Sequence, residues 1–255
     1  AIMAASAGLR AGAGKVTLAV PENLAYAVES GPPEIMTLSL PATPAGTIDA
    51  SGFEIIMETS AAMDAIILGP GISMHPRTVE LVHQLIQHIG IPIVLDADGL
   101  NALSQDITAL AGIRNDLILT PHPGEMARLN RISASEVQSH RVLVSIDFAV
   151  RHKVHLTLKG AHTINASPSG LAWLNPTGNP ALASGGTGDV LAGVIGGFLT
   201  QGLSCERAMV AGTYIHGLSG DIAATEIGGI GLTATDLLTF LPRARACTLS
   251  VEKGA

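Results

Sequence analysis

Short apolar runs without alternation constrain the fold of this chain more than any other feature. In Ile66-Ile67-Leu68 and Ile91-Pro92-Ile93-Val94-Leu95, no polar residue stands at every second position. Strands with this pattern are covered on both faces, as in a parallel sheet flanked by helices. Helix-like segments lie between the runs, and right-handed crossovers then give an α/β fold, a three-layer αβα sandwich. We find no internal repeat and no convincing linker, so the sequence predicts a single domain over residues 1–255.

Strands and helices are expected to alternate over most of the chain. The strands are expected at residues 15–20, 34–40, 64–68, 91–95, 117–120, 155–159, 162–166 and 171–174. The helices are expected up to residue 10, at residues 53–63, 79–88 and 100–103, from residue 125, and at residues 135–151, 190–201, 205–224 and 235–245. Gly160 separates two of these strands and predicts a hairpin there.

Composition and charge exclude several classes of partner. The chain is 47% apolar and 14% charged, with 29 glycines, which suits a large buried core with many tight turns. The net charge of −7 and the lack of a Lys/Arg run argue against nucleic acid and anionic membranes. No stretch approaches the ~18 uninterrupted apolar residues of a transmembrane helix. Cys205 and Cys247 are too few for a disulfide framework, so we expect free thiols in a reducing cytoplasm.

A glycine-rich turn, Gly185-Gly186-Thr187-Gly188-Asp189, leads directly into an apolar helix. The first N–H groups of a helix have no partner inside it, and a phosphate fits that place. Asp189 puts a carboxylate where a phosphate would sit. It is either a base that removes a proton from an attacking hydroxyl or a cap of its own helix, and the turn alone leaves both open.

The loops after the other strands repeat this combination of glycine and a polar group. Ligands of open α/β sheets bind beyond the carboxyl ends of the strands. The residues found at these places, strand by strand, are Gly69 and Gly71, then Asp96, Asp98 and Asn101, then His122 between two prolines, and last Lys159 before Gly160.

Each of these groups also has a purely structural interpretation. The glycines at 69 and 71 could simply make a tight turn, and Asp96 and Asp98 could cap the next helix. Lys159 is either a surface lysine or a contact to a nucleotide phosphate. The rigid backbone around His122 favours a site residue, whereas His216, in an apolar helix, is expected to be buried and hydrogen-bonded.

Three nucleotide-binding or hydrolase fingerprints are absent from the sequence. There is no G-x-x-x-x-G-K-[ST], no G-x-G-x-x-G after a first strand, and no G-x-S-x-G. The other histidines show no metal-ligand spacing, so no protein ligand of a metal can be assigned.

Four motifs together resemble one family. They are Leu-Asp-Ala-Asp-Gly-Leu-Asn-Ala-Leu (95–103), Thr-Pro-His-Pro-Gly-Glu-Met-Ala-Arg-Leu (120–129), Leu-Lys-Gly-Ala-His-Thr-Ile (158–164) and Thr-Gly-Asn-Pro-Ala-Leu-Ala-Ser-Gly-Gly-Thr-Gly-Asp-Val-Leu-Ala-Gly (177–193). In this order they are similar to the ADP-dependent NAD(P)H-hydrate dehydratases, a branch of the ribokinase-like superfamily. The similarity extends from Leu9 to about Leu241.

The resemblance implies a ribokinase-like fold with a mainly parallel central sheet, and a repair reaction. The (6S) hydrate of NADH or NADPH is dehydrated while ADP is split to AMP and phosphate. ADP is the implied co-substrate. Mg²⁺ is expected as cofactor from phosphoryl-transfer chemistry, where the ion offsets charge on the diphosphate, and the sequence assigns no protein ligand to it. The resemblance also implies a possible epimerase partner, and low charge with high apolarity predicts a homo-oligomer, with a tetramer as the working hypothesis.

The family's site residues carry over only where the motifs match. Asp189 matches the acid that contacts the hydrate and would activate its hydroxyl. The hydrate side would further include Ala1, Gly69, Gly71, Asp96, Asn101 and His122. The ADP side would include Lys159, Gly160, Ala161, His162, Thr163, Gly185, Gly186, Thr187 and Gly188.

This sequence also departs from the family pattern. The strand and glycine-containing loop that normally precede the first helix are missing, which leaves one wall of the pocket and an edge of the sheet undetermined. Ser73 and Ala181 stand where glycine is usual. Two other functions therefore stay open, an ATP-dependent small-molecule kinase of the same superfamily and a nucleotide-binding sensor without catalysis.

Overall fold

The computed structural model describes residues 1–113 and 116–249, so the last six residues of the predicted domain lie outside the described part. Its main sheet has six strands in the order β3-β4-β5-β6-β7-β8. Their bounds are β3 (Ile66–Leu68), β4 (Ile93–Leu95), β5 (Leu117–Leu119), β6 (His155–Leu158), β7 (Ile164–Ala166) and β8 (Ala172–Leu174). The pairs from β3 to β6 are parallel, and β6-β7-β8 is an antiparallel meander. The mainly parallel sheet and the hairpin at Gly160 are thus confirmed.

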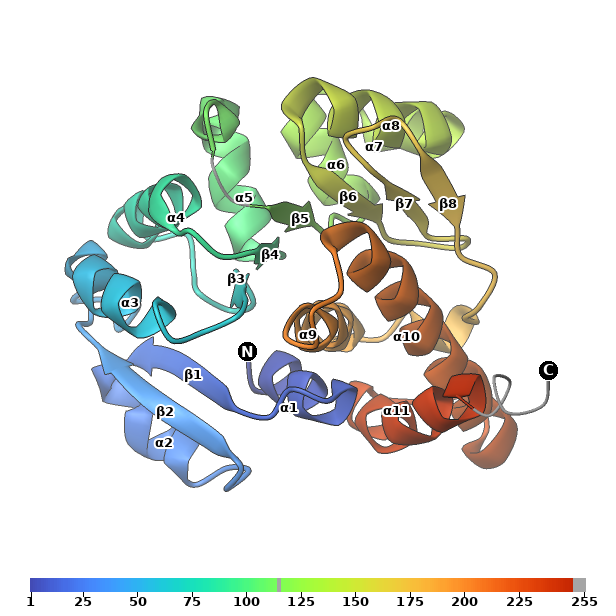
Figure 1. Cartoon of the computed structure of the whole chain (residues 1–255), viewed down its shortest axis with the longest axis horizontal. Coiled ribbons are helices and arrows are strands. Elements are labelled where there is room, and N and C mark those ends of the chain that lie inside the picture. Colours follow the sequence, from blue (N-terminus) through green and yellow to red (C-terminus); the bar gives the residue numbers. More distant parts are fainter. Residues whose placement is uncertain (114–115, 250–255) are drawn as a thin grey trace.

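Helices cover both faces of this sheet and form two apolar cores (Figure 1). One layer contains α1 (Ile2–Ala11), α9 (Thr187–Leu199), α10 (Cys205–Ile227) and α11 (Ala234–Leu249). The other contains α4 (Pro76–His88), α5 (Asp98–Gln105), α6 (Pro123–Asn130), α7 (Ala134–Ser139) and α8 (Arg141–His152). Alternate strand residues point to opposite layers. Val94 and Ile118 therefore join the core under α9 and α10, while Leu95 and Leu119 join the other. This is the expected αβα sandwich.

Two strands near the N-terminus form a sheet of their own. Strand β1 (Val16–Pro21) pairs in parallel with β2 (Ile35–Leu40), flanked by α2 (Ala25–Glu29) and α3 (Phe53–Ser60). Within the described residues neither strand pairs with β3. A cavity of about 230 Å³, mostly apolar, lies between β1 and β3 and reaches Ala1.

Small residues bring α1 and α9 into close contact. A Cβ atom on Gly193 would lie 2.2 Å from the Ala4 carbonyl oxygen, and one on Gly197 would lie 2.8 Å from that of Gly8. Only glycine permits this approach. The contact fixes the first turn of α9 beside the start of α1.

Several expected element boundaries are wrong. The helix expected at 135–151 is two helices, because His140 leaves helical geometry at φ −132° and ψ 35°. Helix α9 begins at Thr187 instead of residue 190, and α10 and α11 extend further than expected. Strand β7 begins at Ile164, because His162 has a positive φ of 53°, which ends an extended run.

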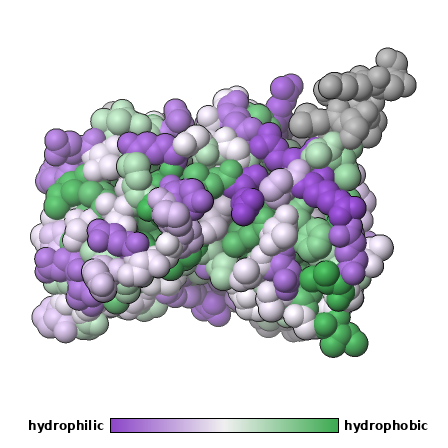
Figure 2. Space-filling view, turned by 90° about the horizontal axis from the view of Figure 1, so that it is seen from below, coloured by the Kyte–Doolittle hydropathy of each residue, from purple (hydrophilic) through white to green (hydrophobic). Residues whose placement is uncertain are grey.

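The surface hydropathy and the length of the helices are relevant to whether the protein contacts other subunits or a membrane. On the face seen in Figure 2, apolar side chains are interspersed with polar ones. Among the described residues, no helix is both long enough and apolar enough to cross a bilayer.

Candidate active site

The glycine-rich turn before α9 presents main-chain N–H groups at the start of the helix. Gly186 precedes the helix with φ 86°, and the Thr187 hydroxyl donates to the carbonyls of Leu182 (2.8 Å) and Ser184 (2.9 Å), which fixes the turn. Among the described residues, no acceptor is found for the main-chain N–H groups of Gly188 and Asp189. These free donors stand at the positive end of the α9 dipole. An arrangement of this kind is able to hold a phosphate.

Asp189 lies in the first turn of α9 but does not cap it. The N-cap of this helix is Gly186, and within residues 1–113 and 116–249 no side chain makes a cap hydrogen bond there. Instead, Asp189 Oδ2 lies 3.3 Å from the main-chain nitrogen of Ala1, and the carboxylate is partly exposed. The capping interpretation of Asp189 is therefore wrong, and its oxygens face the region where α1 begins.

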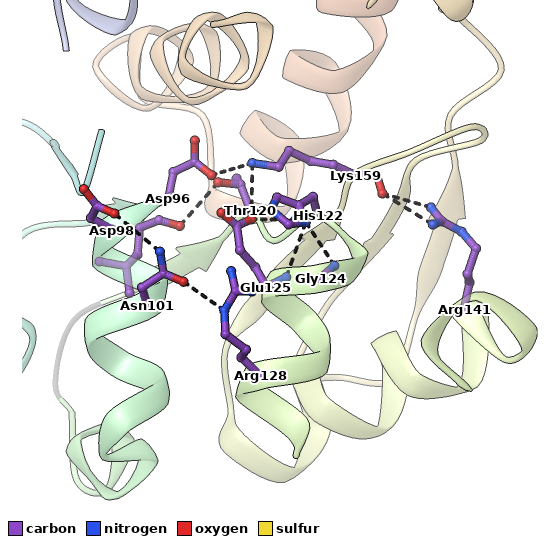
Figure 3. Close-up of polar contacts among 11 residues, drawn as sticks. Asp96, Asp98, Asn101, Thr120, His122, Gly124, Glu125, Arg128, Arg141 and Lys159 are labelled. Carbon is purple, nitrogen blue, oxygen red and sulfur yellow. Dashed lines mark hydrogen bonds and ion pairs between the residues drawn. The ribbon is translucent and has the colours of Figure 1, made fainter. Parts of the chain in front are cut away.

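Lys159, at the carboxyl end of β6, is held between two buried carboxylates (Figure 3). Its Nζ lies 2.6 Å from Asp96 Oδ1 and 3.7 Å from Glu125 Oε2. Asp96 is 1% exposed, so this ion pair is almost withdrawn from water. A Cβ atom on Gly188 would lie 3.3 Å from Lys159 Nζ and 3.8 Å from Asp96 Oδ2. The structure thus brings Lys159 and Asp96 to the glycine-rich turn, although 63 residues separate the two in sequence.

The loops after β3 and β4 interlock through their backbones. Gly69 has φ 127°, and a Cβ atom there would lie 1.8 Å from the Asp96 carbonyl oxygen, so this position requires glycine. Asp98 Oδ2 accepts from the N–H of Ser73 at 3.0 Å, so Asp98 joins the two loops without capping α5. Gly71 has φ 70° with open space around it. Ser73, where glycine is usual, also has a positive φ of 80°.

Asn101 lies further from the glycine-rich turn, on α5. Its Oδ1 accepts from Arg128 Nε of α6 at 3.0 Å, which joins the two helices (Figure 3). Its Nδ2 lies 3.4 Å from Asp98 Oδ1. The side chain is partly buried and takes part in the polar rim of the site.

His122 is the N-cap of α6. Its Nδ1 accepts from the N–H groups of Gly124 (3.0 Å) and Glu125 (3.3 Å), and Glu125 Oε2 accepts from the N–H of His122 at 2.7 Å. This is a capping box with histidine in place of serine or threonine. The ring is about half exposed. The cap gives His122 a structural role that the sequence did not indicate, and its contact with the hydrate stays a prediction.

Arg141 is a candidate that sequence reasoning missed. Its guanidinium donates to the carbonyls of Leu158 (3.1 Å) and Lys159 (3.4 Å), and it lies against Gly160, which has φ 136°. Burial lowers the pKa of Arg141 from its ordinary value. A basic residue at the start of a helix gave no signal, because only the folded chain brings it to the turn after β6.

The remaining turn residues, Gly160 to Thr163, form a tight connection between β6 and β7. The Thr163 hydroxyl donates to the Gly160 carbonyl at 3.0 Å. Ala161 and His162 are both exposed, and Thr163 is partly buried. All four residues follow Lys159 directly in the chain, and their contact with a nucleotide stays a prediction.

His216 is hydrogen-bonded as expected, and it packs under the glycine-rich turn. Its Nε2 lies 2.9 Å from the Thr187 carbonyl oxygen. Burial, together with the positive charge of Lys159, lowers the pKa of His216 to about 4, against the opposing effect of its bond to Thr187. The ring is therefore neutral at physiological pH and donates from Nε2, supporting the turn from below.

Known proteins resemble this chain over almost its whole length. The family model described as NAD(P)H-hydrate dehydratase matches residues 1–243. The chain belongs to this family. The resemblance carried by the four motifs is thus confirmed.

Relatives of this family differ in length. A bifunctional NAD(P)H-hydrate repair enzyme of Moorella thermoacetica is 45% identical over 240 residues, which are 94% of this chain and 45% of that protein. The chain therefore spans about half the length of such relatives. An ADP-dependent (S)-NAD(P)H-hydrate dehydratase of Xanthomonas campestris is 33% identical over 241 residues, 94% of this chain and 81% of that protein.

Solved structures agree with the fold. The ADP/ATP-dependent NAD(P)H-hydrate dehydratase of Bacillus subtilis, co-crystallized with ATP and Mg²⁺ and soaked with CoA, superposes with a TM-score of 0.79 at 30% identity. The match covers 96% of this chain and 86% of that one. The ribokinase-like fold expected from the motifs is confirmed.

Proposed function

We propose that this protein dehydrates the (6S) hydrate of NADH or NADPH at the expense of ADP, releasing AMP and phosphate. One observation carries the proposal: a carboxylate, Asp189, shares the first turn of α9 with free main-chain N–H donors, and the Lys159 ammonium lies against the same turn. A base, an anion hole and a cation in one place are the parts that phosphoryl transfer needs. The names of the relatives supply the substrate.

The proposed reaction has two steps. Asp189 takes the proton of the hydrate's hydroxyl as its oxygen bonds to the β-phosphorus of ADP, and the bond from that phosphorus to the AMP oxygen breaks. The C6–O bond of the nicotinamide ring then breaks and phosphate leaves with the bonding electrons. The C5 proton passes to water, and the C5–H electrons form the restored double bond. The N–H groups of Gly188 and Asp189 would hold the transferring phosphoryl, and Lys159 would balance charge on the diphosphate.

Mg²⁺ is part of the proposal. Mg²⁺ prefers oxygen ligands and keeps several waters, so it is commonly held by phosphates and one or two carboxylates. The residues present fit this mode, since Asp96 Oδ2 faces Gly188 while Oδ1 holds Lys159. The ion would supply positive charge to the diphosphate when bound.

The remaining expectations from the sequence also stay predictions. They concern the contacts of the individual site residues, one domain over residues 1–255, a homo-oligomer, a cytoplasmic location and cooperation with an epimerase. The epimerase is supported by the relatives, since the Moorella protein is named bifunctional.

The test follows the recovery of reduced-nicotinamide absorbance from hydrated NADH with Mg²⁺ and ADP, ATP or no nucleotide. Asp189→Asn should fold normally and lose about 10²–10⁴ of the turnover. Asp147→Asn, on the exposed side of α8, is the matched control and should change nothing. Near wild-type turnover of Asp189→Asn would remove Asp189 from the chemistry. A stable phosphorylated product formed from ATP would indicate a kinase instead, and ADP binding without turnover a sensor.

A further inference from the structure

Three side chains with metal-binding atoms meet at the opposite edge of the main sheet. They are Asp116, just before β5, His155, the first residue of β6, and Cys205, the first residue of α10. A carboxylate oxygen, a ring nitrogen and Sγ lie within 4.8 Å of one another. Lys159 marks the carboxyl end of β6, so this cluster lies at the amino ends of the strands, away from the candidate active site.

Strand alternation explains why the three meet. Ile118 of β5 faces the core beneath α9 and α10, and Asp116, two residues earlier, shares that side. Thr157 of β6 faces the same way, since its hydroxyl is linked through Asn165 to Thr213 of α10. His155, two residues before Thr157, therefore also points toward α10.

Cys205 is the first residue of α10 because Ser204 is the N-cap of that helix. The Ser204 hydroxyl accepts from the N–H of Arg207 at 3.4 Å and sets the start of α10. Cys205 is 4% exposed, so its sulfur is presented inward to the two strands. Three separate elements thus converge on one point.

One nitrogen of the cluster, on His155, lacks the hydrogen-bond partner that a purely structural role would provide. His155 Nδ1 is buried, and no hydrogen-bond partner for it is found in the described part of the chain. A buried polar atom without a partner costs free energy, so such atoms are rare unless something binds them. Glu206, beside Cys205, adds negative charge that acts on His155.

We propose that Asp116, His155 and Cys205 bind a divalent cation of the zinc type, with water in the fourth position. Zn²⁺ is bound by thiolate, imidazole and carboxylate in tetrahedral geometry. At ordinary bond lengths the ligand atoms of such a site are roughly 3.4–3.6 Å apart. The separations here, none above 4.8 Å, need to close by about 1.2–1.4 Å at most, and the exposed side chain of Asp116 has the freedom to move.

Binding would change the state of the thiol. Without a metal, burial and the neighbouring Asp116 raise the pKa of Cys205 to about 12, so it is a neutral thiol that bonds to the carboxylate. A coordinating thiol is deprotonated by the metal. Metal uptake therefore releases the thiol proton and forms a metal–sulfur bond, with no oxidation or reduction.

The experiment adds Co²⁺ to the metal-free protein without nucleotide and records its absorption spectrum. A cobalt–thiolate charge-transfer band in the near ultraviolet, with visible bands of tetrahedral intensity, is the expected result, and Zn²⁺ should abolish both. Cys205→Ser should lose the charge-transfer band. Asp116→Asn should weaken cobalt binding by at least about 10-fold, the least that losing even an outer-shell partner costs.

Two variants serve as matched controls. Cys247→Ser removes the other cysteine and Asp189→Asn alters the candidate active site, and both should keep the band. The proposal would be overturned if the unaltered protein showed no charge-transfer band. It would also be overturned if Cys247→Ser lost the band while Cys205→Ser kept it. Should Cys205→Ser fail to fold, Asp116→Asn decides, because unchanged cobalt affinity there would also overturn the three-ligand site.

Discussion

The ion pair between Lys159 and Asp96 allows a sharp prediction, because it is both buried and part of the candidate site. Lys159→Met keeps the length of the side chain and removes its charge. It leaves Asp96, 1% exposed, and Glu125, 6% exposed, without a cation. Breaking a buried pair from one side costs about 3–5 kcal/mol of unfolding free energy. We expect Lys159→Met to lose stability in this range and to bind ADP more weakly.

A double variant separates the two effects. Lys159→Met/Asp96→Asn removes both charges, and we expect it to be about 1–3 kcal/mol more stable than the sum of the single changes. Urea denaturation measures the stability, and calorimetry measures ADP binding. The ADP affinity should stay low in the double variant, because the cation near Gly188 is still absent.

Two results would refute this reasoning. If Lys159→Met is as stable as the wild type within about 0.5 kcal/mol, the pair is solvated and does not hold the loops together. If Lys159→Met binds ADP normally, Lys159 does not contact the nucleotide. The two outcomes are independent, since one concerns folding and the other binding.

Two further predictions concern pH and packing. The pKa of His216 is lowered from 6.5 to about 4 in the folded state. As pH falls through this window the unfolded state takes up the proton first, so the free energy of unfolding falls by roughly 3 kcal/mol at most. Urea denaturation of His216→Gln should show a smaller loss over the same pH range, and an unchanged dependence of stability on pH would assign the acid sensitivity to other groups. Gly193→Ala should lower the free energy of unfolding by about 1–3 kcal/mol, because the added Cβ overpacks α1 against α9. Gly90→Ala has no atom near its added Cβ and should be nearly neutral. Equal melting temperatures of the two variants would show that α1 moves to make room.

The sequence was most informative where local chemistry decides the structure. Apolar runs predicted the parallel strands, and the glycines at 69, 160 and 186 predicted turns that have positive φ. Because parallel strands end at one edge of a sheet, the polar residues after them could be predicted to meet. The family resemblance then named the chemistry, which local patterns left open.

What the sequence missed depends on contacts between distant segments. The break at His140 carries no glycine or proline, so the apolar pattern continues through it. Nothing near Arg141 indicates that it reaches the carbonyls after β6. The capping box of His122 went unrecognised because histidine is an unusual N-cap. The separate β1–β2 sheet likewise follows from packing that no local signal reports.

The way the site is assembled has a consequence for folding. Asp96 and Lys159 are 63 residues apart, and Ala1 lies 188 residues from Asp189, which it contacts. Contacts this distant form slowly, because long loops must close before they gain any stabilisation. The β6-β7-β8 meander and the α10–α11 pair are local and can form earlier. A nascent or partly refolded chain would therefore hold much of its secondary structure before it had anywhere to place a nucleotide.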